Sequence, residues 1–359
     1  MRHDTPLQPG AAIGILGGGQ LGRMLAMAGA ELGFDIHVFD PEPNCPTARV
    51  CDRAWAAPWS DLGAVQAFAA RCAAVTFEFE NVPLEALEAA ASAAPVRPGA
   101  KSLELTQDRV TEKAFINGLG IPTAPWAAVD SLDTLKAAIE TVGAPSILKT
   151  RRFGYDGKGQ ARLKSPSDAE AAWDEIGGQP AILEGFAPFT RELSVVAARA
   201  LDGTVLPFPL AENVHRGGIL RESTGPAEAG DVIRDQAIAI AEKIGAGLEH
   251  VGVFAVELFD MGEQGLWVNE IAPRVHNSGH WTMDACPAGQ FEQHMRAVAG
   301  WPLGDAQPHS GCTMTNLIGH DVDAWEDLIA DPDVRLHLYG KRAVRDGRKM
   351  GHVNRLKKL

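Results

Sequence analysis

The first hundred residues alternate between short apolar runs and longer segments with helical spacing. The apolar runs, which are typical of buried strands, lie at 11–17, 35–40 and 73–80. The segments 21–33 and 83–94 carry apolar residues three and four positions apart, as amphipathic helices do. Strands that alternate with helices predict a parallel, doubly wound sheet. We therefore expect a Rossmann-like α/β domain at the N-terminus.

This pattern changes at 94–102, where two prolines and a glycine interrupt it, and we place a domain boundary near residue 100. Beyond it the apolar runs are longer, and turn sequences at 201–204 and 261–265 predict hairpins of antiparallel strands. Helices are expected near 107–120, 131–142, 167–177, 230–245 and 288–299. The β-rich runs after residue 310 are too short to fold alone, so we expect them to pack on the second domain.

Composition narrows the possible partners. The 359 residues carry a net charge of −13, which offers no basic surplus for binding the phosphates of a nucleic acid. No apolar run approaches the roughly 18 residues of a membrane span, and the first ten residues lack the apolar stretch of a secretory signal. The five cysteines form no C-x-x-C pair, which favours reduced thiols. We expect a cytoplasmic protein with no nucleic-acid or membrane partner.

The loop after the first predicted strand contains a G-x-G-x-x-G pattern in Gly17, Gly19 and Gly22. Backbone N–H groups and a helix N-terminus can bind phosphate there, and Asp40 stands about where a dinucleotide enzyme holds a ribose hydroxyl. Taken alone, the pattern favours NAD. The same glycines also suit tight packing of a strand on a helix, so the pattern leaves a purely structural loop open.

A second glycine-rich loop, "KTRRFGYDGKGQ" at 149–160, lies between two predicted strands. It lacks the P-loop spacing. Its glycines leave backbone N–H groups unobstructed and its lysines supply cations, a combination that suits a loop covering a triphosphate; these residues are Lys149, Gly154, Gly157, Lys158 and Gly159. The alternative is a surface hairpin with solvated charges.

Two carboxylates end consecutive predicted strands, Glu257 and Glu270, with Asn269 beside the second. If these strands form a hairpin, their alternation places both carboxylates on one face. Paired hard oxygens suit Mg²⁺, which bridges protein carboxylates to nucleotide phosphates. A purely structural pair of carboxylates is the alternative.

Polar side chains crowd the segment that follows, in Arg274, His276, Asn277, Ser278 and His280. This density of donors suits an anion beside a metal-bound phosphate. Upstream, the stretch 182–196 places two glutamates eight residues apart around a proline-containing link. Such a link can contact an adenine edge through its backbone while a carboxylate binds ribose hydroxyls.

Six stretches together resemble the ATP-grasp family of N5-carboxyaminoimidazole ribonucleotide synthetases: "GGGQLGRM", "TFEFENVP", "FGYDGKGQ", "ENVHRGGIL", "NEIAPRVHNSGHWT" and "GRKMGHVN". The resemblance runs from residue 11 to about 355. It implies an ATP-grasp fold of mixed α/β and α+β type in three parts. These are a Rossmann-like pre-ATP-grasp domain at 1–100, the ATP-grasp domain with two α+β lobes at 101–300, and a small C-terminal β-rich segment at 301–359 that packs on the grasp domain.

The resemblance also implies an activity in purine biosynthesis. ATP phosphorylates bicarbonate to carboxyphosphate, and the amine of 5-aminoimidazole ribonucleotide takes the carboxyl group with release of phosphate. The implied cofactors are ATP and Mg²⁺, or Mn²⁺ in its place, the partners are small molecules, and a homodimer is expected. No NAD is expected, so Asp40 is interpreted as structural.

Carried over residue by residue, the resemblance assigns most of the site. The nucleotide is assigned to Arg109, Lys149, Gly154, Tyr155, Asp156, Gly157, Lys158, Gly159, Glu184, Gly185, Phe186, Ala187, Glu192, His215, Asn269 and Glu270. The metal is assigned to Glu257 and Glu270. Bicarbonate and the imidazole are assigned to Tyr155, Asp156, Lys158, Arg274, His276 and Asn277, and the ribonucleotide and its 5′-phosphate to Gln20, Lys341 and Arg348.

Three other interpretations stay open. Another ATP-grasp ligase, such as a formate-dependent transformylase or a biotin-carboxylase-like protein, would share the phosphate loop and both carboxylates, but "GRKMGHVN" disfavours it. A nucleotide-binding regulator without turnover would keep the fold. A dehydrogenase would need a hydride-transfer site, and none accompanies the glycines.

Overall fold

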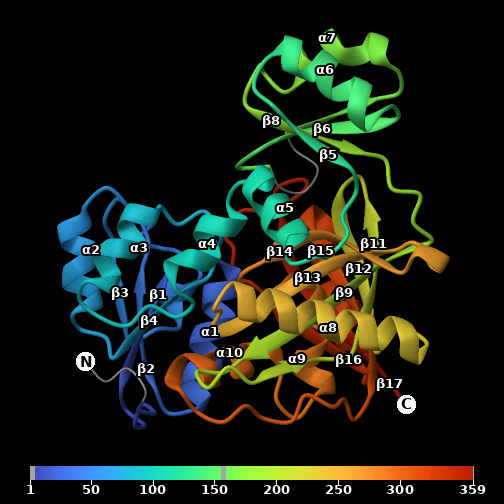
Figure 1. Ribbon diagram of the computed structural model, residues 1–359. Helices are drawn as coiled ribbons and strands as arrows, with labels where there is room; N and C mark the ends of the chain where they lie inside the picture. The colour runs from blue at the N-terminus through green and yellow to red at the C-terminus, as the bar shows by residue number, and fades with distance from the viewer. Residues whose placement is uncertain (1–4, 155–158, 359) are drawn as a thin grey trace.

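The computed structural model describes residues 5–154 and 159–358, arranged around three sheets (Figure 1). The first sheet is parallel, has the order β3-β2-β1-β4, and forms the body at the left of Figure 1. Its strands are β1 (Ala12–Leu16), β2 (Asp35–Phe39), β3 (Arg53–Trp55) and β4 (Ala74–Phe77). Its helices are α1 (Gln20–Glu31), α2 (Leu62–Ala69) and α3 (Leu84–Ala91). The predicted parallel α/β arrangement is confirmed, although β3 and α2 were not predicted.

A second, antiparallel sheet with the order β5-β8-β6-β7 forms the upper lobe in Figure 1. Its strands are β5 (Trp126–Val129), β6 (Ser146–Thr150), β7 (Gln160–Leu163) and β8 (Ala181–Gly185). Two helices, α6 (Leu132–Val142) and α7 (Ala169–Glu175), cover it and share its apolar core. Helices α4 (Ala100–Thr106) and α5 (Arg109–Gly118) lead into this lobe from the first sheet.

The largest sheet has nine strands in the order β14-β13-β9-β11-β12-β15-β17-β16, with β10 paired to β9. The strands before residue 300 are β9 (Arg191–Arg199), β10 (Val205–Pro207), β11 (Ala211–Arg216), β12 (Ile219–Gly225), β13 (Gly252–Asp260) and β14 (Leu266–Ala272). The others are β15 (Gly311–Ile318), β16 (Val334–Leu338) and β17 (Lys349–Lys357). The C-terminal strands therefore continue the large sheet through the pairing of β12 with β15.

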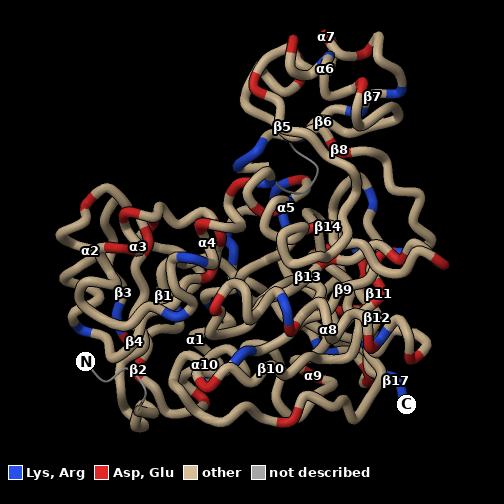
Figure 2. The backbone as a smooth tube through the Cα atoms, viewed as in Figure 1, with Lys and Arg blue, Asp and Glu red and all other residues tan. Residues whose placement is uncertain are grey.

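Four further helices accompany the large sheet: α8 (Asp231–Gly247), α9 (Thr282–Ala285), α10 (Gln290–Ala299) and α11 (Trp325–Ile329). The hairpin β11–β12 was not predicted, because its polar sequence carries little apolar alternation. Its turn needs Gly217 and Gly218, which both have positive φ. Among the described residues no helix is long and apolar enough to cross a membrane. Figure 2 shows acidic and basic residues distributed over all three parts of the fold.

The glycine loop between β1 and α1 is occupied by the protein's own carboxylates. Gly19 N and Gly22 N donate to the two oxygens of Glu78, at 2.8 and 3.0 Å. Gly18 N donates to Asp40 Oδ2 at 2.7 Å. A Cβ atom on Gly19 would lie 2.5 Å from Glu78 Oε1, so only glycine allows this approach. The N–H groups that would bind a dinucleotide's pyrophosphate already have acceptors, and Asp40 has a structural role.

Two buried histidines connect the large sheet to the N-terminal part of the chain, His294 through β4 and His250 through α4. His294 Nδ1 accepts from Val253 N at 3.0 Å, so its proton lies on Nε2, which lies 2.8 Å from Thr76 Oγ1 on β4. His250 Nε2 lies 3.1 Å from Val253 O and its Nδ1 lies 3.0 Å from Ser102 Oγ on α4. Burial lowers the pKa of both histidines to about 3. Both rings are therefore neutral at pH 7.

We expect the protein to lose stability as the pH falls below 6.5. The folded-state pKa of His250 and His294 lies below the ordinary value of 6.5, so the unfolded chain binds more protons. Each histidine should lower the free energy of unfolding by about 2 kcal/mol between about pH 6.5 and pH 5, a range above the ordinary carboxylate pKa. Urea unfolding at several pH values measures this. His294→Gln should reduce the slope, and an unchanged slope would contradict the assignment.

We also expect Glu78 to be needed for the stability of the glycine loop. Glu78→Gln replaces one acceptor oxygen by an NH₂ group, which leaves Gly19 N or Gly22 N without a partner, and should lower the free energy of unfolding by about 1–3 kcal/mol. Glu88→Gln, on the exposed side of α3, is the matched control and should change stability little. Equal stability of the two variants in urea would show that the loop does not depend on this carboxylate.

Candidate active site

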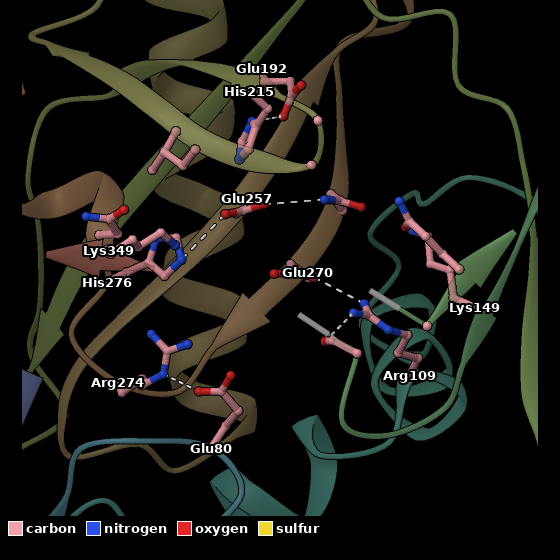
Figure 3. Close-up of a pocket in the computed structure, with 18 of the residues that line it drawn as sticks. Glu80, Arg109, Lys149, Glu192, His215, Glu257, Glu270, Arg274, His276 and Lys349 are labelled. Atoms are coloured by element: carbon pink, nitrogen blue, oxygen red, sulfur yellow. Dashed lines mark hydrogen bonds and ion pairs between the residues drawn. The ribbon is translucent and has the colours of Figure 1, made fainter. Parts of the chain in front are cut away.

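A cavity of about 780 Å³ opens where the three sheets meet (Figure 3). Most of the side chains assigned from the sequence line it, although they come from segments far apart in the chain. These residues are Gln20, Arg109, Lys149, Gly154, Gly159, Glu192, His215, Glu257, Asn269, Glu270, Arg274, His276 and Asn277. In Figure 3 Arg109 and Lys149 lie on one side of Glu257 and Glu270, while Arg274 and His276 lie on the other.

The structure does not bring every assigned residue to the cavity wall. Tyr155, Asp156, Gly157 and Lys158 lie outside the described residues. Glu184 is buried behind Lys149, and Gly185, Phe186 and Ala187 follow it away from the lining. Lys341 Nζ donates to Lys349 O at 2.7 Å and Arg348 Nη1 donates to Ala343 O at 3.0 Å, and neither residue lines the cavity.

The cavity wall also contains residues that were not assigned from the sequence, among them Glu78, Glu80, Phe189, Phe259 and Lys349. The two glutamates and the lysine stand inside "TFEFENVP" and "GRKMGHVN", which carried the family resemblance, so a signal was available for them. Phe259 follows Glu257 by two positions on β13 and therefore shares its face. Phe189 and Phe259 stack with their ring centres 4.5 Å apart and their planes 3° from parallel.

The predicted hairpin carries the two acidic residues directly opposite each other. Glu257 on β13 pairs in register with Glu270 on β14, and the register shifts just beyond Glu257. Arg109 Nη1 lies 3.1 Å from Glu270 Oε2, and Asn269 Nδ2 donates to Glu257 Oε2 at 3.4 Å. Burial, with the charge of Glu270, raises the pKa of Glu257 to about 7. Burial acts to raise the pKa of Glu270 too, but Arg109 outweighs it and lowers that pKa.

This carboxylate pair suits a divalent cation. Burial and the neighbouring Glu270 raise the pKa of Glu257, and a cation bound between the two carboxylates would offset both effects. In the described part of the chain no group of three or more His, Cys, Asp or Glu residues is placed to enclose a metal. Mg²⁺ does not need such a group, because it usually takes one or two carboxylates and completes its octahedron with water and substrate phosphates.

On the opposite side of the pair, Arg274 and His276 form a polar wall. Arg274 Nε donates to Glu80 Oε2 in a short ion pair. Burial acts to raise the pKa of Glu80, but Arg274 outweighs it and holds that pKa at about 2. The two groups therefore stay charged, and the pair ties the loop after β4 to the segment after β14.

His276 is held as a neutral donor. Its Nδ1 accepts from Ser278 N at 3.3 Å, so the ring proton lies on Nε2, which is 3.5 Å from Glu257 Oε1. Burial and the charge of Arg274 lower the pKa of His276 to about 3. Beside it, the amide of Asn277 is fixed by two hydrogen bonds to the amide of Asn316 on β15, at 3.0 and 2.6 Å.

Two further ion pairs bring charge to the cavity. Lys149 Nζ lies 2.6 Å from Glu184 Oε2, and His215 Nδ1 lies 2.7 Å from Glu192 Oε2. Burial acts to lower the pKa of His215, but Glu192 and the more distant Glu257 outweigh it and raise that pKa. A cation, a carboxylate with its histidine and a pair of stacked rings thus surround one half of the cavity.

Three family models match successive parts of the chain. The ribonucleotide synthetase preATP-grasp domain matches residues 11–107 and the ATP-grasp domain matches 114–291. The phosphoribosylaminoimidazole carboxylase C-terminal domain matches 312–358. The expected ATP-grasp fold with a Rossmann-like N-terminal domain and a β-rich C-terminal segment is confirmed.

Curated relatives and solved structures are similar over nearly the whole chain. The N5-carboxyaminoimidazole ribonucleotide synthase of Brucella melitensis is 50% identical over 98% of both chains. The crystal structure of the synthetase from Thermus thermophilus has a TM-score of 0.91 and 46% identity, and covers 96% of this chain and 93% of that one.

The Aspergillus clavatus synthase, crystallised with ADP and the aminoimidazole ribonucleotide, has a TM-score of 0.92 and 31% identity over 98% of this chain and 95% of that one. The fold of this chain therefore matches that of the Aspergillus clavatus synthase along nearly its whole length. With half of its residues shared with a curated relative across almost the full length of both, this protein belongs to the family of N5-carboxyaminoimidazole ribonucleotide synthases, which are ATP-grasp ligases.

Proposed function

We propose that this protein carboxylates the amine of 5-aminoimidazole ribonucleotide, at the expense of ATP and bicarbonate, in purine biosynthesis. A bicarbonate oxygen attacks the γ-phosphorus of ATP, which gives ADP and carboxyphosphate. The amine nitrogen then attacks the carboxyl carbon, the bond from that carbon to the phosphate oxygen breaks, and the amine loses a proton. The observation that carries this proposal is the shared cavity in which a nucleotide half and an arginine–histidine half meet across two carboxylates.

In the nucleotide half, the geometry supports phosphate binding by Arg109 and Lys149, which line the cavity. The glycine loop from Gly154 to Gly159 stays our assignment from the sequence for covering the phosphates. We assign the ribose hydroxyls to Glu192, and the ion pair of this carboxylate with His215 supports the assignment because it holds the side chain in place. The segment from Glu184 to Ala187, with the neighbouring Phe189 and Phe259, is our candidate for adenine.

Glu257, Glu270 and Asn269 would hold Mg²⁺, or Mn²⁺ in its place, against the phosphates. When bound, the metal supplies positive charge that screens the phosphate oxygens during transfer. The carboxylates face each other from a rigid hairpin, and Arg109 keeps Glu270 ionised and therefore ready to ligate.

In the carboxylation half, Arg274 and neutral His276 are donors fixed before substrate binds. Such preorganised donors stabilise negative charge on a transferring carboxyl group without reorganisation. Asn277, with Tyr155, Asp156 and Lys158 of the glycine loop, completes our assignment for bicarbonate and the imidazole. Gln20, Lys341 and Arg348 stay our assignment for the ribonucleotide and its phosphate, and we add Lys349, because it lies on the cavity wall.

We further propose that residues 1–100, 101–300 and 301–359 are the three parts of the chain, the last of them packed on the second, and that the protein works as a homodimer in the cytoplasm. The family models support the first division, since their limits fall near these boundaries. Free thiols at all five cysteines suit a reducing compartment. The dimer rests on the family resemblance.

The experiment that tests this function is ADP release from MgATP and bicarbonate, with and without 5-aminoimidazole ribonucleotide, followed by identification of the product. We expect release that depends on the ribonucleotide and a labile carbamate as product, because the amine is the acceptor of the carboxyl group. Release that ignores this ribonucleotide and requires formate with another one would replace the proposed substrate while keeping the nucleotide site.

We expect Glu257→Gln to raise the Mg²⁺ concentration needed for half-maximal turnover by about tenfold or more, because a neutral amide binds this hard cation more weakly than a carboxylate does. Glu263→Gln, in the exposed turn of the same hairpin, is the control and should keep the wild-type requirement. Mg²⁺ titrations at fixed ATP measure the difference. Equal requirements in both variants would remove Glu257 from the metal site.

A further inference from the structure

Lys113 is a buried lysine that has no part in the mechanism above. It lies on α5, its side chain is 1% exposed, and it does not line the cavity. Burying an ammonium group is unfavourable unless partners compensate it. The identity of those partners therefore indicates what the residue does.

Lys113 contacts residues from two different sheets. Its Nζ donates to the backbone carbonyl of Asn269 on β14 in a short hydrogen bond. The same atom lies 3.6 Å from Glu184 Oε1 on β8. That oxygen has no hydrogen-bond partner within 5–154 and 159–358, and the ammonium group of Lys113 lies beside it. One side chain thus links the upper lobe to the hairpin that carries the carboxylate pair.

The other oxygen of Glu184 continues the link toward the cavity. Glu184 Oε2 lies 2.6 Å from Lys149 Nζ, and Lys149 lines the nucleotide half. Burial acts to raise the pKa of Glu184, but Lys149 and Lys113 outweigh it and hold that pKa at about 2. Glu184 therefore stays ionised. One of its oxygens pairs with Lys149, which lines the cavity, and the other faces Lys113 behind it.

Four other ionisable groups surround Lys113, whose pKa is lowered by burial. Glu184 and Lys149 face it from the upper lobe, and Glu112 and Arg109 come from its own helix. Glu112 accepts from Ile271 N at 2.6 Å, so α5 holds β14 at two neighbouring places. In Figure 1 α5 lies between the upper lobe and β13–β14, as these contacts require.

A purely stabilising role explains this arrangement poorly. Replacing a buried ion pair with apolar side chains is often neutral or stabilising, so stability alone does not call for a buried lysine. A network of charged groups does fix the orientation of its side chains, because each charged group has few alternative partners. Both ends of this network reach the cavity wall, at Lys149 and at Asn269 beside Glu270.

We propose that Lys113 is a positioning residue for the nucleotide: through Glu184 it aims Lys149 at the phosphates, and through the Asn269 carbonyl it holds β14 at a matching distance. The inference rests on the proposed function, because it assumes that a nucleotide occupies this half of the cavity. Lys113 touches neither substrate nor metal in this proposal. It sets the spacing between the two lobes that grip the nucleotide.

The test is the affinity of the full-length protein for MgADP, measured by calorimetry at a temperature where circular dichroism shows each variant folded. Lys113→Met keeps the length of the side chain and removes its charge and donors, and we expect the Kd to rise by about 10- to 100-fold, the range seen for groups that orient ligating residues. Lys113→Gln should fall between Lys113→Met and wild type, because its amide donates to the Asn269 carbonyl but cannot neutralise Glu184. Should Lys113→Met not fold, Lys113→Gln decides the question.

Lys101→Met is the matched control. Lys101 pairs with Glu249 on the exposed surface, outside the site, and its loss should leave the Kd unchanged. A role in stability alone would reduce the number of active molecules and the apparent kcat, and would leave the Kd for MgADP and the KM for ATP at wild-type values. Wild-type Kd and KM in the Lys113 variants would therefore overturn the inference. Failure of wild type and Lys101→Met to bind MgADP would instead overturn the proposed function.

Discussion

Two glutamates that face each other on one hairpin constrain the rest of the cavity. Like charges this close repel, and burial adds to the cost, so one member, Glu257, has its pKa raised to about 7. The other, Glu270, stays ionised because Arg109 reaches it from the first turn of α5. Asp108 caps that turn by accepting from Val110 N at 2.8 Å, which fixes where the arginine starts. The charged groups around the hairpin thus meet one requirement, which is to offset the repulsion between two buried carboxylates.

The same requirement explains why the site is assembled from distant segments. Arg109 and Lys149 come from α5 and β6, whereas Glu257 and Glu270 come from β13 and β14, so these elements must meet to bring the charges together. The first sheet and α4 are held against this assembly by the neutral histidines His294 and His250. His294 can accept from Val253 N only while its ring is deprotonated. Arg274 and Glu80 add a second, charged connection between the same two bodies.

Much of this could be predicted from the sequence where a local pattern carries the information. Alternating apolar residues identified the β13–β14 hairpin, and with it the pairing of Glu257 and Glu270. The family resemblance named most of the residues that line the cavity. Local patterns could not reveal that Lys349, rather than Lys341 or Arg348, reaches the wall, because this depends on the pairing of β15 with β17. Lys113 was missed for a similar reason, since a single lysine in an amphipathic helix gives no sign that it is buried between two sheets.

The pairing of β12 with β15 makes the end of the chain part of the enzyme's core architecture, and this has a consequence during synthesis. Asn277 receives its partner Asn316 only when β15 has been made, and Lys349 follows later still. Thr76 gains its hydrogen-bond partner His294 only after a further 218 residues have been made. Contacts this far apart close late and slowly as a chain leaves the ribosome. The nascent polypeptide therefore exposes an unfinished sheet edge and an open cavity until β15 and β17 have emerged, so catalytic competence and protection from aggregation are acquired together.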